Sequence, residues 1–166
     1  SLQNDRGRII IPLIDREGNW FGVQGRSLLP NTTMRYITII FDEDKHKVFG
    51  LNNVKESDPI YIVEGPIDSL FLDNSVAMVG SDVDPRTYSW SDYIWVYDNE
   101  PRNRQIVERI SNSIDRGEKV VIWPQSVAEK DINDMILVGR DPQQIIKNNT
   151  YQGIQAKIKL TEWKRV

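Results

Sequence analysis

The sequence predicts an α/β protein, with a mainly parallel sheet flanked by helices and a small β-rich subdomain before it. Residues 1–58 contain apolar runs separated by turn clusters, which is typical of β-strands. From Pro59 onward, short apolar segments alternate with helical patterns, as in a parallel sheet. The length of 166 residues is sufficient for one domain with a small subdomain.

The N-terminal part predicts a β-hairpin and a third strand. The three predicted strands are rich in apolar residues and lie at 8–13, 20–26 and 35–41. A turn cluster around Gly18 separates the first two, and glycine permits the positive φ that such a turn needs. A charged turn at 42–47 ends the third strand.

The rest of the chain predicts strands and helices in alternation. The predicted strands are short and apolar, and they lie at residues 60–63, 76–79, 93–97 and 119–123. The predicted helices lie at residues 66–72, 102–116, 131–138 and 142–148. The second helix places Ile106, Ile110 and Ile114 on one face and ends at Gly117. We therefore expect a β-rich subdomain at 1–58, an α/β domain at 59–150 and a C-terminal tail at 151–166.

Composition excludes several classes of protein. The chain has no cysteine, so disulfides and a cysteine-based zinc site are excluded. No apolar run approaches the roughly 20 residues of a membrane span. Residues 1–8 are polar and do not resemble a signal peptide. We expect a cytoplasmic protein without a membrane partner.

Charge is unevenly distributed along the chain. The net charge is 0 over residues 1–58, −7 over 59–101 and +4 over 102–166. A solvated acidic surface is one interpretation of the acidic middle. The other is a cation site whose phosphate-bearing ligand is held by the more basic flanks.

Carboxylates follow the predicted parallel strands, where open α/β sheets place their sites. Glu64 ends the first strand, Asp98 and Glu100 follow the third, and Asp131 and Asp134 come after the fourth. Glu64 and Asp98 are 34 residues apart, and Asp98 and Asp131 are 33 apart, about one βαβ unit each. We expect neighbouring strands to bring these side chains together.

Crowded carboxylates repel one another unless a cation compensates. A hard divalent cation with oxygen ligands, Mg²⁺ or Mn²⁺, is the natural partner. Asp68 adds a carboxylate in a first helical turn, where pairing with the helix dipole is the alternative role. For Asp98 and Glu100, the alternative is a solvated turn.

A family resemblance joins these pieces. Residues 60–68 (IYIVEGPID) resemble the first Toprim motif, in which a strand precedes Glu-Gly-x-x-Asp. Residues 97–100 (YDNE) resemble the second motif, Asp-x-Asp, and 130–134 (KDIND) resemble the acidic stretch that follows in primases. The resemblance implies a Toprim-like sheet. It also implies a catalytic set of Glu64, Asp98 and Glu100, with Asp68 and Asp131 as further metal ligands.

The N-terminal part narrows the resemblance to DnaG-type DNA primases, bacterial or phage-like. Residues 7–13, 18–26, 35–37 and 45–51 are similar to the segment before Toprim in that family. There, basic residues line the path of template and nucleotide. The resemblance gives this role to Arg26 and Arg35, and less directly to Lys45.

The chain departs from the family pattern in three respects. Glu100 stands where Asp is usual, and its extra methylene changes the reach of the carboxylate. The segment between Arg35 and Phe49 is shorter than usual, which weakens the match of Lys45. The family's zinc module and helicase-binding domain have no counterpart within these residues.

The resemblance implies an RNA polymerase core that makes primers on single-stranded DNA from ribonucleoside triphosphates and divalent metal. A replicative helicase would be a partner only through domains outside these residues. For a phage-encoded protein, the compartment would be the host cytoplasm. Two alternatives stay open, a Toprim nuclease and a non-catalytic DNA- or protein-binding module.

The other conspicuous residues are expected to be structural. His46, the only histidine, lies in a charged turn and is expected at the surface. Trp90, Trp95 and Trp123 lie in or beside apolar strands, which favours the core over a base-stacking role. The sequence contains no P-loop glycine motif, so nucleotides would bind through metal and basic side chains.

Overall fold

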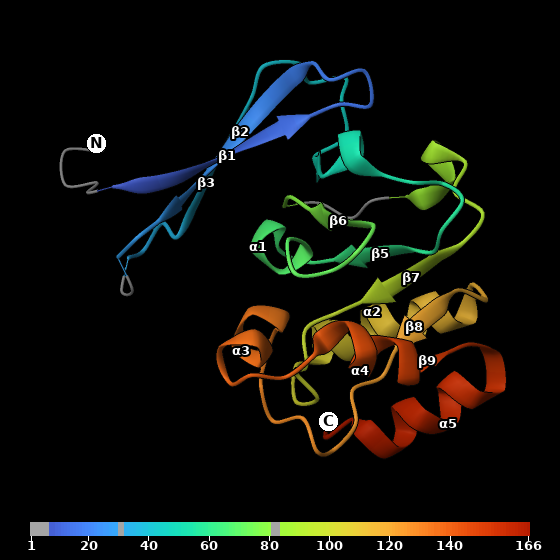
Figure 1. Cartoon of the computed structure of the whole chain (residues 1–166). Coiled ribbons are helices and arrows are strands. Elements are labelled where there is room, and N and C mark those ends of the chain that lie inside the picture. The colour runs from blue at the N-terminus through green and yellow to red at the C-terminus, as the bar shows by residue number, and fades with distance from the viewer. Residues whose placement is uncertain (1–6, 30–31, 81–83) are drawn as a thin grey trace.

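A computed structural model describes residues 7–29, 32–80 and 84–166. It contains two β-sheets (Figure 1). The smaller sheet is antiparallel, in the order β1-β2-β3, with strands β1 Arg8–Ile14, β2 Trp20–Ser27 and β3 Tyr36–Ile40. These are the predicted hairpin and third strand.

The larger sheet has six strands in the order β4-β6-β5-β7-β8-β9. Its strands are β4 Val48–Phe49, β5 Ile60–Val63, β6 Ser75–Met78, β7 Tyr93–Val96, β8 Lys119–Val121 and β9 Thr150–Tyr151. The four inner strands pair in parallel, whereas β4 and β9 pair antiparallel at the edges. The inner strands are almost entirely buried, because helices cover both faces of the sheet.

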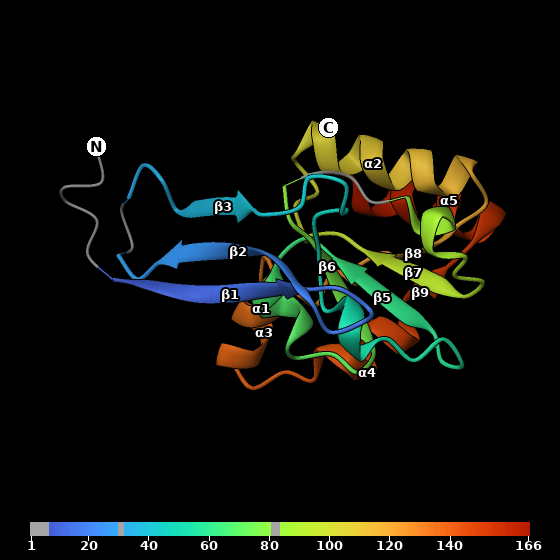
Figure 2. The same cartoon turned by 90° about the horizontal axis from the view of Figure 1, so that it is seen from above.

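Helices α2 and α5 lie on one side of this sheet, and α1, α3 and α4 lie on the other (Figure 2). The α-helices are α1 Pro66–Ser69, α2 Arg104–Asp115, α3 Ile132–Leu137, α4 Pro142–Asn148 and α5 Gly153–Trp163. Two 3₁₀ turns, η1 Leu51–Asn53 and η2 Pro85–Tyr88, lie in the connections. The predicted fold class is therefore confirmed.

Two elements lie outside the expected organisation. Strand β4 belongs by sequence to the N-terminal 58 residues but pairs with β6 of the larger sheet. Residues 151–166, expected as a tail, contain α5, whose Ala156, Leu160 and Trp163 are buried in the main core. These three form a helical stripe, but the exposed Ile154 and Ile158 interrupt the apolar pattern and hide it in the sequence.

A small apolar cluster joins the two sheets. Leu13 and Phe21 of the small sheet pack with Val79, which follows β6, and the partly buried Ile40 and Phe49 complete the cluster. Beyond this contact, β1, β2 and β3 project away from the larger sheet (Figures 1 and 2). Within the described ranges, no helix is long and apolar enough to cross a membrane.

Candidate active site

Four of the predicted carboxylates meet at the carboxyl ends of the parallel strands. Glu64 follows β5 and Asp98 follows β7, and these strands are neighbours in the sheet. Together with Asp68 and Asp131, they line one small cavity of about 10 Å³. That volume is about the minimum needed for one water molecule. The strand-end interpretation therefore brings four acidic side chains to the lining of one cavity.

Gly65 lets Asp68 turn back toward Glu64. A Cβ atom at position 65 would lie 2.7 Å from Oδ2 of Asp68, so a larger residue would displace this carboxylate. The other oxygen, Oδ1, accepts a hydrogen bond of 2.9 Å from the backbone N–H of Asn133. Asp68 thereby links α1 to the first turn of α3, and the Glu-Gly-x-x-Asp spacing has a steric reason.

Asp131 is the N-cap of α3. Its Oδ1 accepts a hydrogen bond of 2.8 Å from the N–H of Asp134, which satisfies one of the free donors of the first turn. One oxygen of Asp131 is thus committed to the helix, which leaves the other for the cavity. Asp134 is exposed and is not among the cavity's lining residues.

Two basic side chains balance the negative charge of this acidic cluster, and the sequence patterns did not identify either of them. Arg109 of α2 lies 3.6 Å from Glu64, measured from Nη1 to Oε1. The ammonium of Lys130 lies 3.7 Å from Asp98 and 3.6 Å from Glu100. Glu100 therefore contacts the cluster through Lys130 and does not line the cavity. Lys130 directly precedes Asp131 in the sequence, a signal that could have identified it.

Burial raises the pKa of the central carboxylates. The pKa of Asp98 rises to about 7, first through burial and then through the neighbouring charge of Glu64. Burial also raises the pKa of Glu64, against the opposing effect of Arg109. It raises that of Asp68, while the bond from Asn133 opposes the rise. Such shifts are typical of functional sites, where like charges are held together.

The donor set fits a hard cation. All its ligands would be carboxylate oxygens, which Mg²⁺ and Mn²⁺ prefer, and Oε1 of Glu64 is buried without a hydrogen-bond partner. As the side chains stand, no group of three or more acidic or histidine residues in the described ranges surrounds one point at ligating distance. Ligation therefore requires Glu64 and Asp98 to turn from Arg109 and Lys130 toward a common centre.

The predicted basic residues Arg26 and Arg35 lie together on the small sheet. Their guanidinium carbons lie 5.8 Å and 5.9 Å from the centre of the Tyr36 ring, so both cations lie close to one half-exposed aromatic side chain. Arg26 also lowers the pKa of Asp68, an electrostatic effect that places its charge near the acidic cluster. Arg26, Arg35 and Tyr36 together form a cationic and aromatic surface on the small sheet.

Lys45 lies elsewhere. Its ammonium is 3.1 Å from Asp15, whose carboxylate also accepts hydrogen bonds from the N–H groups of Glu17 and Asn19. The bond from Asn19 is the main cause that lowers the pKa of Asp15. Lys45 thus supports the turn between β1 and β2, at the opposite end of the small sheet from Arg26. The structure does not bring it to the other two cations.

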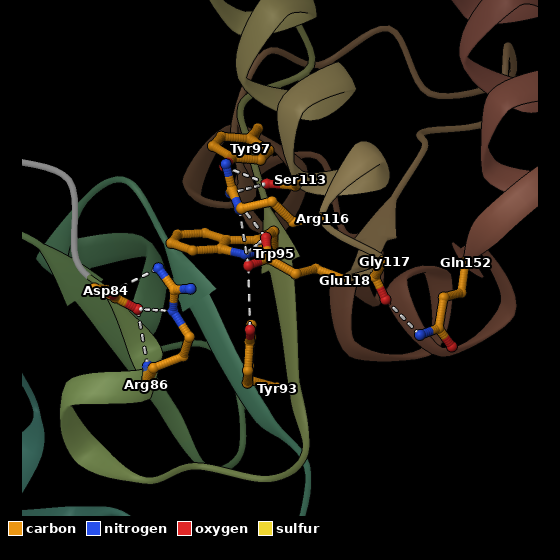
Figure 3. Close-up of polar contacts among 10 residues, drawn as sticks. All are labelled: Asp84, Arg86, Tyr93, Trp95, Tyr97, Ser113, Arg116, Gly117, Glu118 and Gln152. Atoms are coloured by element: carbon orange, nitrogen blue, oxygen red, sulfur yellow. Dashed lines mark hydrogen bonds and ion pairs between the residues drawn. The ribbon is translucent and has the colours of Figure 1, made fainter.

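The face of β7 that lies against α2 carries a network of aromatic and polar side chains (Figure 3). The rings of Trp95 and Tyr97 stack with centroids 5.6 Å apart. Glu118 accepts hydrogen bonds from Tyr93, Trp95 and Arg116. The Glu118 side chain is only 9% exposed, and these donors satisfy its carboxylate.

The conspicuous aromatic residues are placed as expected. Trp90, Trp95 and Trp123 are at most 5% exposed and belong to the main core. His46 is exposed and contacts the edge of Tyr88.

Comparison with known proteins defines the class of this chain. No protein-family model matches it. Its fold matches the zinc-binding and RNA polymerase domains of Aquifex aeolicus primase, with a TM-score of 0.66 and 21% identity over 87% of this chain and 41% of that one. It also matches a DnaG primase catalytic domain solved bound to single-stranded DNA, with a TM-score of 0.55 and 18% identity over 95% of this chain and 53% of that one. The chain has the fold of a DnaG-type primase catalytic core.

By sequence, the chain is related to a phage protein. It is 38% identical over 165 residues to the DNA primase of Enterobacteria phage T4, a match that covers 96% of this chain and 48% of that relative. The chain is therefore related to the DnaG-type primases. It spans about half the length of the curated relative that it matches.

Proposed function

We propose that this chain is the catalytic core of a DNA primase, which synthesises RNA primers on single-stranded DNA with Mg²⁺ or Mn²⁺. One observation carries the proposal: Glu64, Asp68, Asp98 and Asp131 line a single cavity at the strand ends of a primase-core fold. Relationship to a DNA primase over nearly the whole chain supports it.

The acidic residues would act together as a metal centre. When bound, the divalent cations neutralise triphosphate charge and help to activate the primer 3′-hydroxyl. Glu64, Asp98 and Glu100 would supply the main oxygen ligands, and Asp68 and Asp131 would complete the set. In the absence of metal, Lys130 and Arg109 balance the charge of the carboxylates. Metal binding would release both side chains to interact with phosphate oxygens.

The small sheet would hold the nucleic acid. Arg26 and Arg35 offer cations to phosphates, and the half-exposed Tyr36 side chain near them offers a surface on which a base can stack. A single-stranded DNA template and ribonucleoside triphosphates are the proposed ligands, and a replicative helicase would be a partner of the longer protein. Lys45 has the weakest support, because Asp15 binds it.

The test is template-directed synthesis from ribonucleotides on single-stranded DNA, with Mg²⁺ or Mn²⁺. We expect short RNA products from the wild type and none from a Glu64→Gln, Asp98→Asn double variant that still folds. DNA cleavage without RNA synthesis would support a Toprim nuclease in place of a primase. DNA binding with neither reaction would support a non-catalytic module.

A further inference from the structure

Asn99, the middle residue of the 97–100 motif, makes three hydrogen bonds through its side chain. Its Nδ2 donates to the carbonyl oxygens of Val127 and Glu129, each at 3.0 Å. Its Oδ1 accepts from Nε1 of Trp163, also at 3.0 Å. Flipping the amide would set its N–H groups against the indole N–H and its oxygen against two carbonyls. The amide orientation is therefore unique.

The backbone of Asn99 strengthens the same connection. Its N–H donates to the carbonyl oxygen of Lys130 at 2.7 Å. Asn99 thus ties the loop that carries Asp98 and Glu100 to the loop that leads to Asp131. These loops follow two neighbouring strands, β7 and β8, and each carries candidate metal ligands.

The C-terminal helix braces this connection from outside the sheet. Trp163, at the end of α5, is 6% exposed. Two residues later, the N–H of Arg165 donates to the carbonyl oxygen of Pro101 at 2.8 Å. The end of α5 and the segment that follows it therefore each contact the 98–101 loop once, although neither lines the carboxylate cavity.

We propose that Asn99 and Trp163 are positioning residues, which hold the Asp98/Glu100 loop and the Asp131 loop at the separation that metal binding requires. This rests on the proposed function, because it takes these three carboxylates as metal ligands. Neither residue touches a reacting group. Residues that orient metal ligands without binding the metal typically change its affinity about 10–100-fold when they are replaced.

Four variants test the proposal. Asn99→Ala removes all three side-chain hydrogen bonds, and Trp163→Phe removes only the indole donor. The double variant measures their coupling. Trp90→Phe is the matched control, because Trp90 is equally buried but its Nε1 has no hydrogen-bond partner. Mn²⁺ affinity is measured by electron paramagnetic resonance. Amide exchange over 97–103 and 124–131 is measured without metal, and urea unfolding reports stability.

We expect Asn99→Ala to weaken Mn²⁺ binding at least about tenfold and Trp163→Phe to weaken it about fivefold, the effect of one hydrogen bond. The double variant should be little worse than Asn99→Ala. Exchange should rise in both loops but not in β5, and Trp90→Phe should leave Mn²⁺ affinity unchanged even where it lowers stability.

Unchanged Mn²⁺ affinity and exchange in Asn99→Ala would overturn the proposal. Should that variant fail to fold, Trp163→Phe decides in the same way. If the wild type binds no Mn²⁺, or Asp98→Asn binds it equally well, the proposed metal centre fails. Loop exchange in the metal-free variants then still decides whether Asn99 holds the loops.

Discussion

At the scale of single residues, sequence patterns predicted the acidic groups but not their neighbours. Glu64 and Asp98 were found because parallel strands end at one edge of a sheet, so strand position alone brings them together. Arg109, Lys130 and Asn99 depend on how α2 and the loop after β8 pack. Strand periodicity carries no information about that packing.

Asp98 should destabilise the metal-free protein at neutral pH. Its folded pKa of about 7 lies above the usual 3.8, so the folded state holds this proton more tightly than the unfolded state. Stability contributed by this group is therefore complete below pH 4 and is lost as pH rises toward 7. An amide at this position carries no charge, so it removes the free-energy cost of burying the ionised carboxylate.

We expect Asp98→Asn to be more stable than wild type at pH 8 by about 1–4 kcal/mol, and no more stable at pH 4. Urea unfolding in the presence of EDTA at both pH values measures this. A large loss of stability at pH 8 would mean that Asp98 serves the fold. Asp134→Asn, at an exposed position, is the control.

Lys130 should compete with metal for the carboxylates. Its ammonium lies within 4 Å of both Asp98 and Glu100, and its side chain is 55% exposed, so the pairs are screened. Lys130→Gln should therefore strengthen Mn²⁺ binding about fivefold at low salt, with a smaller gain at high salt. Titration at two ionic strengths measures the change, and Lys157→Gln, which alters a remote surface pair, is the control. Weaker binding would show that Lys130 orders the site.

At the scale of elements, strand pairing in the small sheet determines which side chains lie together. Arg26 of β2 lies opposite Tyr36 of β3, and Arg35 directly precedes that strand. The sequence identified the two arginines through a resemblance. It could not show that both lie close to one aromatic ring, because this depends on strand register.

Arg26→Ala and Arg35→Ala should each weaken binding of single-stranded DNA and lower the slope of log affinity against log salt by about one. Mn²⁺ affinity should change less than in Lys130→Gln, since neither arginine lines the carboxylate cavity. Salt-titrated binding curves measure this. Arg86→Ala, which removes an exposed arginine on η2, should bind as wild type. Wild-type binding by both sheet variants would make them ordinary surface arginines.

At the scale of the whole molecule, the sequence predicted the fold class but not the edge strands or the C-terminal helix. Alternating apolar segments predicted the parallel sheet, because buried strands and amphipathic helices have different periods. The antiparallel edges, β4 and β9, have two residues each and carry no periodicity. Helix α5 was missed because Ile154 and Ile158 are apolar yet exposed.

The two sheets should differ sharply in local stability. The six-stranded sheet belongs to one continuous core, whereas the small sheet contributes only Leu13 and Phe21 as buried apolar residues to the cluster that joins them. Its remaining apolar side chains include Ile10 and Ile39, which are 60% and 54% exposed. Regions with few buried apolar contacts open at lower free energy than the global unfolding transition.

We therefore expect amides of β1, β2 and β3 to exchange at least about tenfold faster than those of β5 and β7, because a difference of 1.4 kcal/mol in opening free energy already gives this ratio. Hydrogen exchange read by mass spectrometry measures this ratio.

Single-stranded DNA should slow exchange in β2 and β3 without changing β7, since binding stabilises only the part that it contacts. Phe21→Ala should accelerate exchange in the small sheet and leave β5 protected, because it removes the largest fully buried side chain of the cluster that joins the sheets. Equal protection in both sheets would instead mean that the molecule unfolds as one cooperative unit, with the small cluster alone strong enough to couple them.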